Sequence, residues 1–155
     1  MKGLKENLED IESNKQAGRD LLNDLGLSAP VESCILVIED DHIVLEFLRQ
    51  VVTKSGYKLR CYQDPLEAIK DGEEFRVELL LLDMKLPNMN GLECLTKLRK
   101  AQGNPDFPVI VITGYTQKEM ITEIVKYNIT AIIAKPINKE RLTGYLSKYA
   151  GKAKV

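Results

Sequence analysis

The chain has 155 residues, 44% of them hydrophobic and 29% charged, with a formal net charge of -1; this composition fits one globular core and excludes a disordered tail or a strongly basic nucleic-acid binder. No apolar run approaches the roughly 18 residues of a membrane helix, and the first residues lack the apolar core of a signal peptide. Three scattered cysteines and one histidine make no zinc cluster and fit a reducing compartment, so we expect a cytoplasmic protein that binds neither nucleic acid directly nor membrane.

Residues 1–30 differ in pattern from the rest, and we expect an N-terminal extension or linker. Apolar residues there follow a heptad seam, but Lys15 and Gly18 interrupt its middle, and Gly18 alone would cost about 1 kcal/mol in a helix interior. Two interpretations fit this stretch equally well. It forms either one or two short helices that act as an interaction arm, or a loosely ordered extension. Ser28-Ala29-Pro30 resembles a linker. After this extension, we expect one domain over residues 31–150 and a C-terminal tail over residues 151–155.

From Cys34 onward, apolar strands alternate with amphipathic helices. The predicted strands cover 34–38, 58–63, 79–82, 108–113 and 130–134. The four leucines of 79–82 are too few for a helix and predict a strand buried on both faces. Five strand-helix units in strict alternation predict an α/β, flavodoxin-like (βα)5 three-layer sandwich whose parallel strands have the order 2-1-3-4-5.

Helix boundaries and inward faces follow from caps and from helical spacing. Asp64-Pro65 and Asn90-Gly91 begin the second and third helices, Asn138 caps the last, and Ser55-Gly56 ends the first. The apolar stripes of two helices are Ile43, Val44, Phe47, Leu48, Val51 and Val52 in the first, and Met120, Ile121, Ile124 and Val125 in the fourth. These stripes predict which faces pack on the sheet.

Polar side chains stand at the carboxyl ends of the apolar strands. The first strand ends in Glu39 and Asp40, the third in Asp83, the fourth in Thr113, and the fifth in Lys135. In open parallel sheets reacting groups lie just outside these ends, so the three carboxylates should meet in one crevice. Carboxylates packed together repel unless a cation joins them. The sequence therefore predicts a site for a hard, oxygen-seeking ion such as Mg²⁺.

The same crevice is suited to phosphoryl chemistry. Asp83, on the most buried strand, is placed to attack phosphorus, and carboxylates are known covalent nucleophiles in such reactions. Lys135 and Thr113 offer a positive charge and a hydroxyl donor to the phosphoryl oxygens. Asp41, by contrast, is expected only to begin the first helix.

Four segments, ILVIEDD, LLLLDMKLPNMNG, VIVITGYT and AIIAKP, together carry a family resemblance. In this order and spacing, with 30 residues from Asp83 to Thr113 and 22 from Thr113 to Lys135, the chain from Glu32 to Tyr149 resembles the receiver domain of bacterial response regulators, the CheY-like superfamily.

The resemblance implies phosphotransfer from a histidine kinase or phosphotransfer protein onto Asp83, with an output through an unknown downstream protein and no enzymatic turnover. It implies that Mg²⁺ is held by Glu39, Asp40, Asp83 and the backbone carbonyl of Lys85. It also implies that Gly114 leaves room for the phosphoryl group and that a cis peptide precedes Pro136.

One position departs from the family pattern, and two alternatives stay open. The family usually has an aromatic residue where this chain has Ile132, so a phosphorylation-independent interaction module of the same fold remains possible. A haloacid-dehalogenase-like phosphatase also uses a strand-end aspartate, but needs a second aspartate two residues later, where this chain has Lys85. The chain ends soon after the fifth helix, so no DNA-binding or enzymatic output domain is expected to follow.

Overall fold

The computed structural model describes residues 13–22, 24–27, 31–114 and 117–155, and the chain divides into two units, 1–31 and 32–155. In the first unit, residues 13–22 are helical, and Gln16 Nε2 donates to Asp20 Oδ1 at 2.9 Å. Gly18 lies inside this helix, so its cost did not prevent helix formation. The heptad residues Leu4, Leu8 and Ile11 lie outside the described residues.

The second unit is built on a five-stranded parallel sheet in the order β2-β1-β3-β4-β5, which confirms the predicted topology. Its strands are β1 (Ser33–Ile38), β2 (Leu59–Tyr62), β3 (Arg76–Asp83), β4 (Val109–Thr113) and β5 (Ala131–Ala134). Its helices are α2 (His42–Lys54), α3 (Pro65–Lys70), α4 (Gly91–Gln102), α5 (Lys118–Val125) and α6 (Lys139–Tyr149), followed by the 3-10 turn η1 (Gly151–Ala153).

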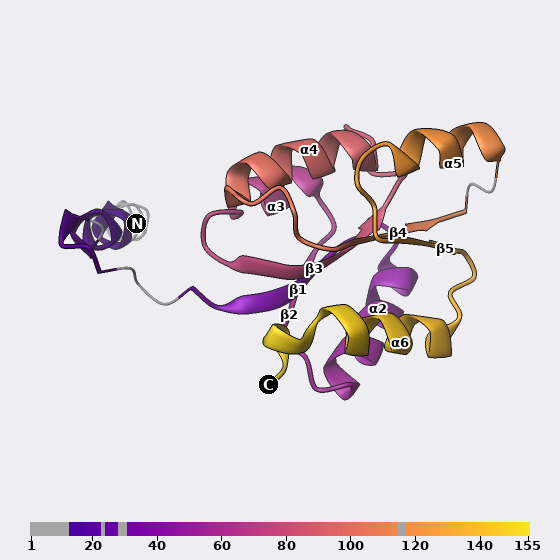
Figure 1. Ribbon diagram of the computed structural model, residues 1–155, viewed down its shortest axis with the longest axis horizontal. Coiled ribbons are helices and arrows are strands. Elements are labelled where there is room, and N and C mark those ends of the chain that lie inside the picture. Colours follow the sequence, from indigo (N-terminus) through magenta and orange to yellow (C-terminus); the bar gives the residue numbers. More distant parts are fainter. Residues whose placement is uncertain (1–12, 23, 28–30, 115–116) are drawn as a thin grey trace, which may run out of the picture. The chain divides into compact units, whose positions relative to one another are not determined.

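Helices cover both faces of the sheet, with α3, α4 and α5 on one face and α2 and α6 on the other (Figure 1). The leucines of β3 show why the central strand is apolar throughout. Leu80 and Leu82 pack in the core under α3, α4 and α5, whereas Leu79 and Leu81 pack in the core under α2 and α6. The predicted burial of this strand on both faces is thereby confirmed.

Side-chain caps fix where the helices begin, as predicted. The carboxylate of Asp41 accepts from the amides of Ile43 and Val44 at 2.9 and 3.2 Å, which starts α2 directly after the acidic pair. Asp64, Asn90 and Asn138 cap α3, α4 and α6 in the same way. Each cap satisfies amides that have no partner within their helix.

The predicted inward faces are partly wrong. Ile43 is 81% exposed and Phe47 37% exposed, while Leu45, which was not in the predicted stripe, is buried. In α5, Val125 is 56% exposed and Ile124 is the buried residue. Both helices carry apolar residues over more than one face, and helical spacing alone does not decide which face packs on the sheet.

The last residues, predicted as a tail, belong to the second unit. Lys58 donates its amide to the carbonyl of Ala153 at 2.8 Å, and the amide of Val155 donates to Gly56 at 2.7 Å. Ala153 is fully buried against the α2 and α6 side of the sheet. Among the described residues, no helix has both the length and the apolar character to cross a membrane.

Candidate functional site

The carboxyl ends of β1, β3, β4 and β5 open into one pocket of about 530 Å³. Its lining residues are Glu39, Asp40, Asp41, Asp83, Lys85, Thr113, Gly114 and Lys135. Every residue that the sequence placed at the site is therefore found here, as the strand order requires.

Asp83 is the last residue of β3 and is 5% exposed. Its Oδ1 accepts the backbone amide of Lys85 at 3.3 Å and lies 3.5 Å from the Lys135 ammonium. The first residue of α4, Gly91, lies directly against the backbone of Asp83. A Cβ built on Gly91 would lie only 2.6 Å from the Asp83 carbonyl oxygen. Gly91 thus permits a close approach of α4 to the end of β3, which residue order alone does not reveal.

Three carboxylates cluster at this edge of the sheet. Ligand oxygens of Glu39, Asp40 and Asp83 all lie within 4.8 Å of one another, with Asp40 exposed and the other two buried. Asp41 lines the same pocket, but its carboxylate is used in capping α2. The arrangement offers three hard oxygen ligands at one point, with one open to solvent.

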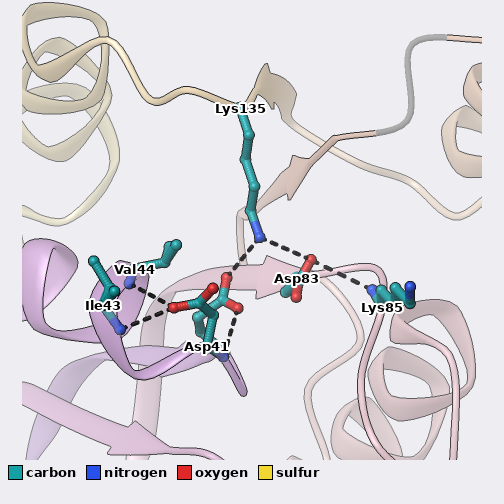
Figure 2. Close-up of polar contacts among 7 residues, drawn as sticks. Asp41, Ile43, Val44, Asp83, Lys85 and Lys135 are labelled. Atoms are coloured by element: carbon teal, nitrogen blue, oxygen red, sulfur yellow. Dashed lines mark hydrogen bonds and ion pairs between the residues drawn. The ribbon is translucent and has the colours of Figure 1, made fainter.

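Lys135 joins two of these acids (Figure 2). Its ammonium lies 3.2 Å from Glu39 Oε2 and 3.5 Å from Asp83 Oδ1. Burial would lower the pKa of Lys135, but the neighbouring Asp83 and Glu39 carboxylates outweigh burial and raise it. Lys135 therefore stays charged and partly neutralises the cluster.

Glu39 is the most buried of the acids, at 1% exposed. Burial raises its pKa from 4.5 to about 7, the Asp83 carboxylate adds to the rise, and the Asp41 amide and the Lys135 ammonium oppose it. That amide donates to Glu39 Oε1 at 3.1 Å. One lysine therefore does not compensate fully for burying this carboxylate beside a second one.

The remaining predicted features border the pocket from β4 and β5. Thr113 ends β4, is 1% exposed, and its carbonyl accepts the amide of Lys135 at 2.9 Å. A Cβ built on Gly114 would meet nothing within 4 Å, so this position is open on the pocket side. The Lys135-Pro136 peptide is cis, as the resemblance implied.

Two positions outside the acidic cluster remain to be placed. Tyr115, which directly follows Gly114 in the VIVITGYT segment, lies outside the described residues. Ile132 is half-buried and packs against the core under α3, α4 and α5, which is where an apolar residue without a polar tip should lie.

Both the sequence and the fold match known proteins. Residues 35–147 match the family described as response regulator receiver domain. The chain is 30% identical over 129 residues to the response regulator protein TmoT of Ectopseudomonas mendocina, covering 83% of this chain and 55% of that protein. It is 29% identical over 119 residues to the polar-differentiation response regulator DivK of Brucella ovis, covering 77% and 97%. The chain thus spans about half of TmoT and nearly all of DivK.

Solved structures share the fold. The crystal structure of a CheY-like response regulator receiver domain protein from Methanospirillum hungatei is 28% identical, with a TM-score of 0.67 over 77% of this chain and 93% of that one. The chemotaxis response regulator CheY4 of Vibrio cholerae, at 22% identity, has a TM-score of 0.68 over 77% of this chain and 98% of that one.

Proposed function

The chain belongs to the response regulator receiver domain family, and from that premise we propose that Asp83 accepts a phosphoryl group from a histidine kinase or a phosphotransfer protein. The observation that supports this most is the pocket itself. The residues that line this one cavity include the strand-end carboxylate of Asp83, the acids Glu39 and Asp40, Lys135 and Thr113. This set supplies a nucleophile, oxygen ligands for a cation, a positive charge and a hydroxyl donor.

The proposed step is a displacement at phosphorus. A carboxylate oxygen of Asp83 forms a bond to phosphorus while the bond from phosphorus to the donor's histidine nitrogen breaks. The electron pair of that bond returns to the imidazole, and Asp83 becomes an acyl phosphate. No general base on this chain is needed, because a carboxylate attacks through an oxygen lone pair and, unlike a hydroxyl, has no proton to give up.

Mg²⁺ is the proposed cofactor, and the residues fit it. Glu39, Asp40 and Asp83 supply hard carboxylate oxygens within 4.8 Å of one another. Burial, with a smaller contribution from Asp83, raises the pKa of Glu39 to about 7, and a divalent cation beside it would oppose that rise. The backbone carbonyl of Lys85 is the fourth proposed ligand. When bound, Mg²⁺ would supply positive charge that neutralises the phosphoryl oxygens.

Lys135 and Thr113 are proposed to hold the phosphoryl group after transfer. The Lys135 ammonium lies 3.5 Å from the accepting carboxylate, so a small movement takes it from the two acids to a phosphoryl oxygen. Thr113 offers a hydroxyl from the neighbouring strand end. Both groups would stabilise charge that is present after transfer and absent before it.

We propose that the phosphorylated chain signals by binding a downstream protein and does not turn over a substrate. Lys85 lies where a haloacid-dehalogenase-like phosphatase would need its acid, and a protonated lysine is a poor general base for the water that would release phosphate. Acyl phosphate should therefore accumulate on Asp83 rather than be released at each transfer.

Incubation with Mg²⁺ and acetyl phosphate, followed by intact mass measurement, tests the proposal. The wild-type chain should gain a single phosphate, whereas Asp83→Asn should gain none and keep its fold by circular dichroism. Release of inorganic phosphate without an adduct would favour the phosphatase. No reaction with either acetyl phosphate or a phosphorylated phosphotransfer domain would favour the interaction module.

A further inference from the structure

A second and larger groove, of about 690 Å³, lies between α4 and α5. Both helices cover the same face of the sheet (Figure 1). Three of the chain's four methionines, Met84, Met89 and Met120, line this α4–α5 groove, and the fourth is Met1. Thioether side chains are flexible and polarisable, and are overused where a surface must adapt to an apolar partner.

The groove follows both helices lengthwise. α4 contributes Leu92 and Thr96, one turn apart, and α5 contributes Met120 and Glu123, with Tyr127 just beyond its end. The stretch from Met120 to Tyr127 corresponds to about two helical turns, or roughly 10 Å. An apolar channel of this length beside two helices suits a third helix whose apolar residues recur at i, i+3 or i+4, and i+7.

The two ends of the groove are held differently. At the C-terminal end of α5, the guanidinium of Arg99 donates to the carbonyls of Tyr127 and Asn128 at 2.5 and 3.0 Å, which ties α5 to α4. At the other end, Gln117 makes no side-chain cap to α5, and Ile124 is the buried residue of that helix. Since α5 buries Ile124 alone whereas α4 buries five residues, fewer buried contacts hold α5 than hold α4.

The charges around the groove favour an acidic partner. Glu93 pairs with Lys97 at 3.4 Å and Glu123 with Lys126 at 2.8 Å. Among the residues that the structure describes, the Lys85 ammonium makes no ion pair, and Lys85 lines both this groove and the pocket of Asp83. A carboxylate on a partner bound in the groove would form an ion pair with Lys85, at the end of the groove nearest Asp83.

We propose that the α4–α5 groove docks an amphipathic helix of a partner protein, with its apolar residues on the methionines and a carboxylate on Lys85. This inference rests on the proposed function, since it assigns the output contact to a surface that shares Lys85 and the segment after Asp83 with the phosphoacceptor site. Docking there would read the state of Asp83 directly through the β3–α4 connection.

A displayed library of amphipathic helical peptides, each about 15 residues or roughly 22 Å long, tests the inference on the full chain with Mg²⁺ and beryllofluoride. Selected peptides are then measured on two matched variants. Thr96 and Thr122 are both exposed helical threonines that donate to the carbonyl four residues earlier, but only Thr96 lines the groove. Thr96→Arg should weaken binding at least about tenfold, and Thr122→Arg should leave it unchanged.

Methionine methyl NMR locates the contact, because Met84, Met89 and Met120 all report on the groove. Their signals should shift with peptide. Changing the peptide's carboxylate to an amide should cost about two- to fivefold on the wild-type chain and nothing on Lys85→Gln. Selection of no helical peptide, equal loss on both threonine variants, silent methionine methyls, or an amide penalty that persists on Lys85→Gln would overturn the inference.

The acetyl phosphate reaction, run on the same preparations, separates this inference from the proposed function. Thr96 lies outside the Asp83 pocket, so Thr96→Arg should still take up one phosphate. A phosphorylated chain without groove-directed peptides would refute docking alone. Groove-directed peptides on a chain that is never phosphorylated would refute the phosphoacceptor function and leave the docking surface standing.

Discussion

Glu39→Gln should stabilise the metal-free protein, and the gain should grow with pH. Burial raises the pKa of Glu39 from 4.5 to about 7, so between these values the folded chain keeps a proton that the unfolded chain has lost. The free energy of unfolding then falls as pH rises, by about 1.4 kcal/mol per unit. Over the full shift, the wild-type chain loses at most about 3 kcal/mol of unfolding free energy. This stability is fully present below pH 4.5 and is lost above about pH 7.

Glutamine keeps the shape of the protonated acid and cannot ionise, so the variant should lack this fall. In EDTA, urea denaturation at a series of pH values should give equal stabilities near pH 4.5, and a variant more stable by up to about 3 kcal/mol at pH 8. The variant loses the ion pair between Glu39 and Lys135, but the Lys135 ammonium keeps its ion pair with Asp83 at 3.5 Å. This remaining ion pair limits the stability that the substitution costs.

Mg²⁺ should narrow this difference in stability, because the ion binds the ionised carboxylate of the wild-type chain. At a hundred times its dissociation constant, a ligand adds about 2.7 kcal/mol, and the glutamine variant should gain less. Glu46→Gln is the matched control, since Glu46 is an exposed acid of α2 paired with Arg49 at 3.3 Å, and its effect should stay within about 0.5 kcal/mol at every pH. Parallel pH profiles for the wild-type and Glu39→Gln chains in EDTA would refute the reasoning.

Three further predictions follow from the same geometry. Asp40→Asn should weaken Mg²⁺ binding at least about tenfold without destabilising the chain in EDTA, and a melting temperature titrated with Mg²⁺ would show it; unchanged Mg²⁺ affinity would count against the cluster. Gly91→Ala should lower stability by about 1–3 kcal/mol and slow phosphorylation, because its Cβ would lie 2.6 Å from the Asp83 carbonyl oxygen; a more stable variant in urea would contradict this. Gln102→Ala should cost about 1–3 kcal/mol in the same assay, because the Gln102 amide accepts from the Val77 amide at 3.0 Å and donates to two loop carbonyls, whereas a neutral substitution would show that water replaces these bonds.

The strand order and the meeting of the site residues could be predicted because both follow from burial and connectivity. A run such as Leu79–Leu82 has one stable place, the centre of a sheet covered on both faces. Once that order is set, Asp83, Thr113 and Lys135 must stand at neighbouring strand ends, and the pocket contains all three.

The features that could not be predicted from the sequence depend on how closely the helices and strands pack against one another. Ile43 and Phe47 have the spacing of a buried stripe, yet both are exposed because Leu45 and its neighbours pack instead. Glu39 was predicted as a ligand, and that stays a prediction; its 1% exposure and its 3.2 Å contact with Lys135, of which the first raises its pKa and the second lowers it, were not predicted. Neither quantity can be read from residue order, since each depends on how closely the strands and helices pack.

Chemical location of the phosphate tests the central claim most directly. After reaction with acetyl phosphate and Mg²⁺, borohydride reduces an aspartyl phosphate to homoserine, and peptide mass spectrometry identifies the changed residue. The peptide that contains Asp83 should carry the modification, and the peptides that contain Glu39 and Asp40 should not. Homoserine at any other aspartate, or an adduct that persists in Asp83→Asn, would contradict the assignment of Asp83 as the phosphoacceptor.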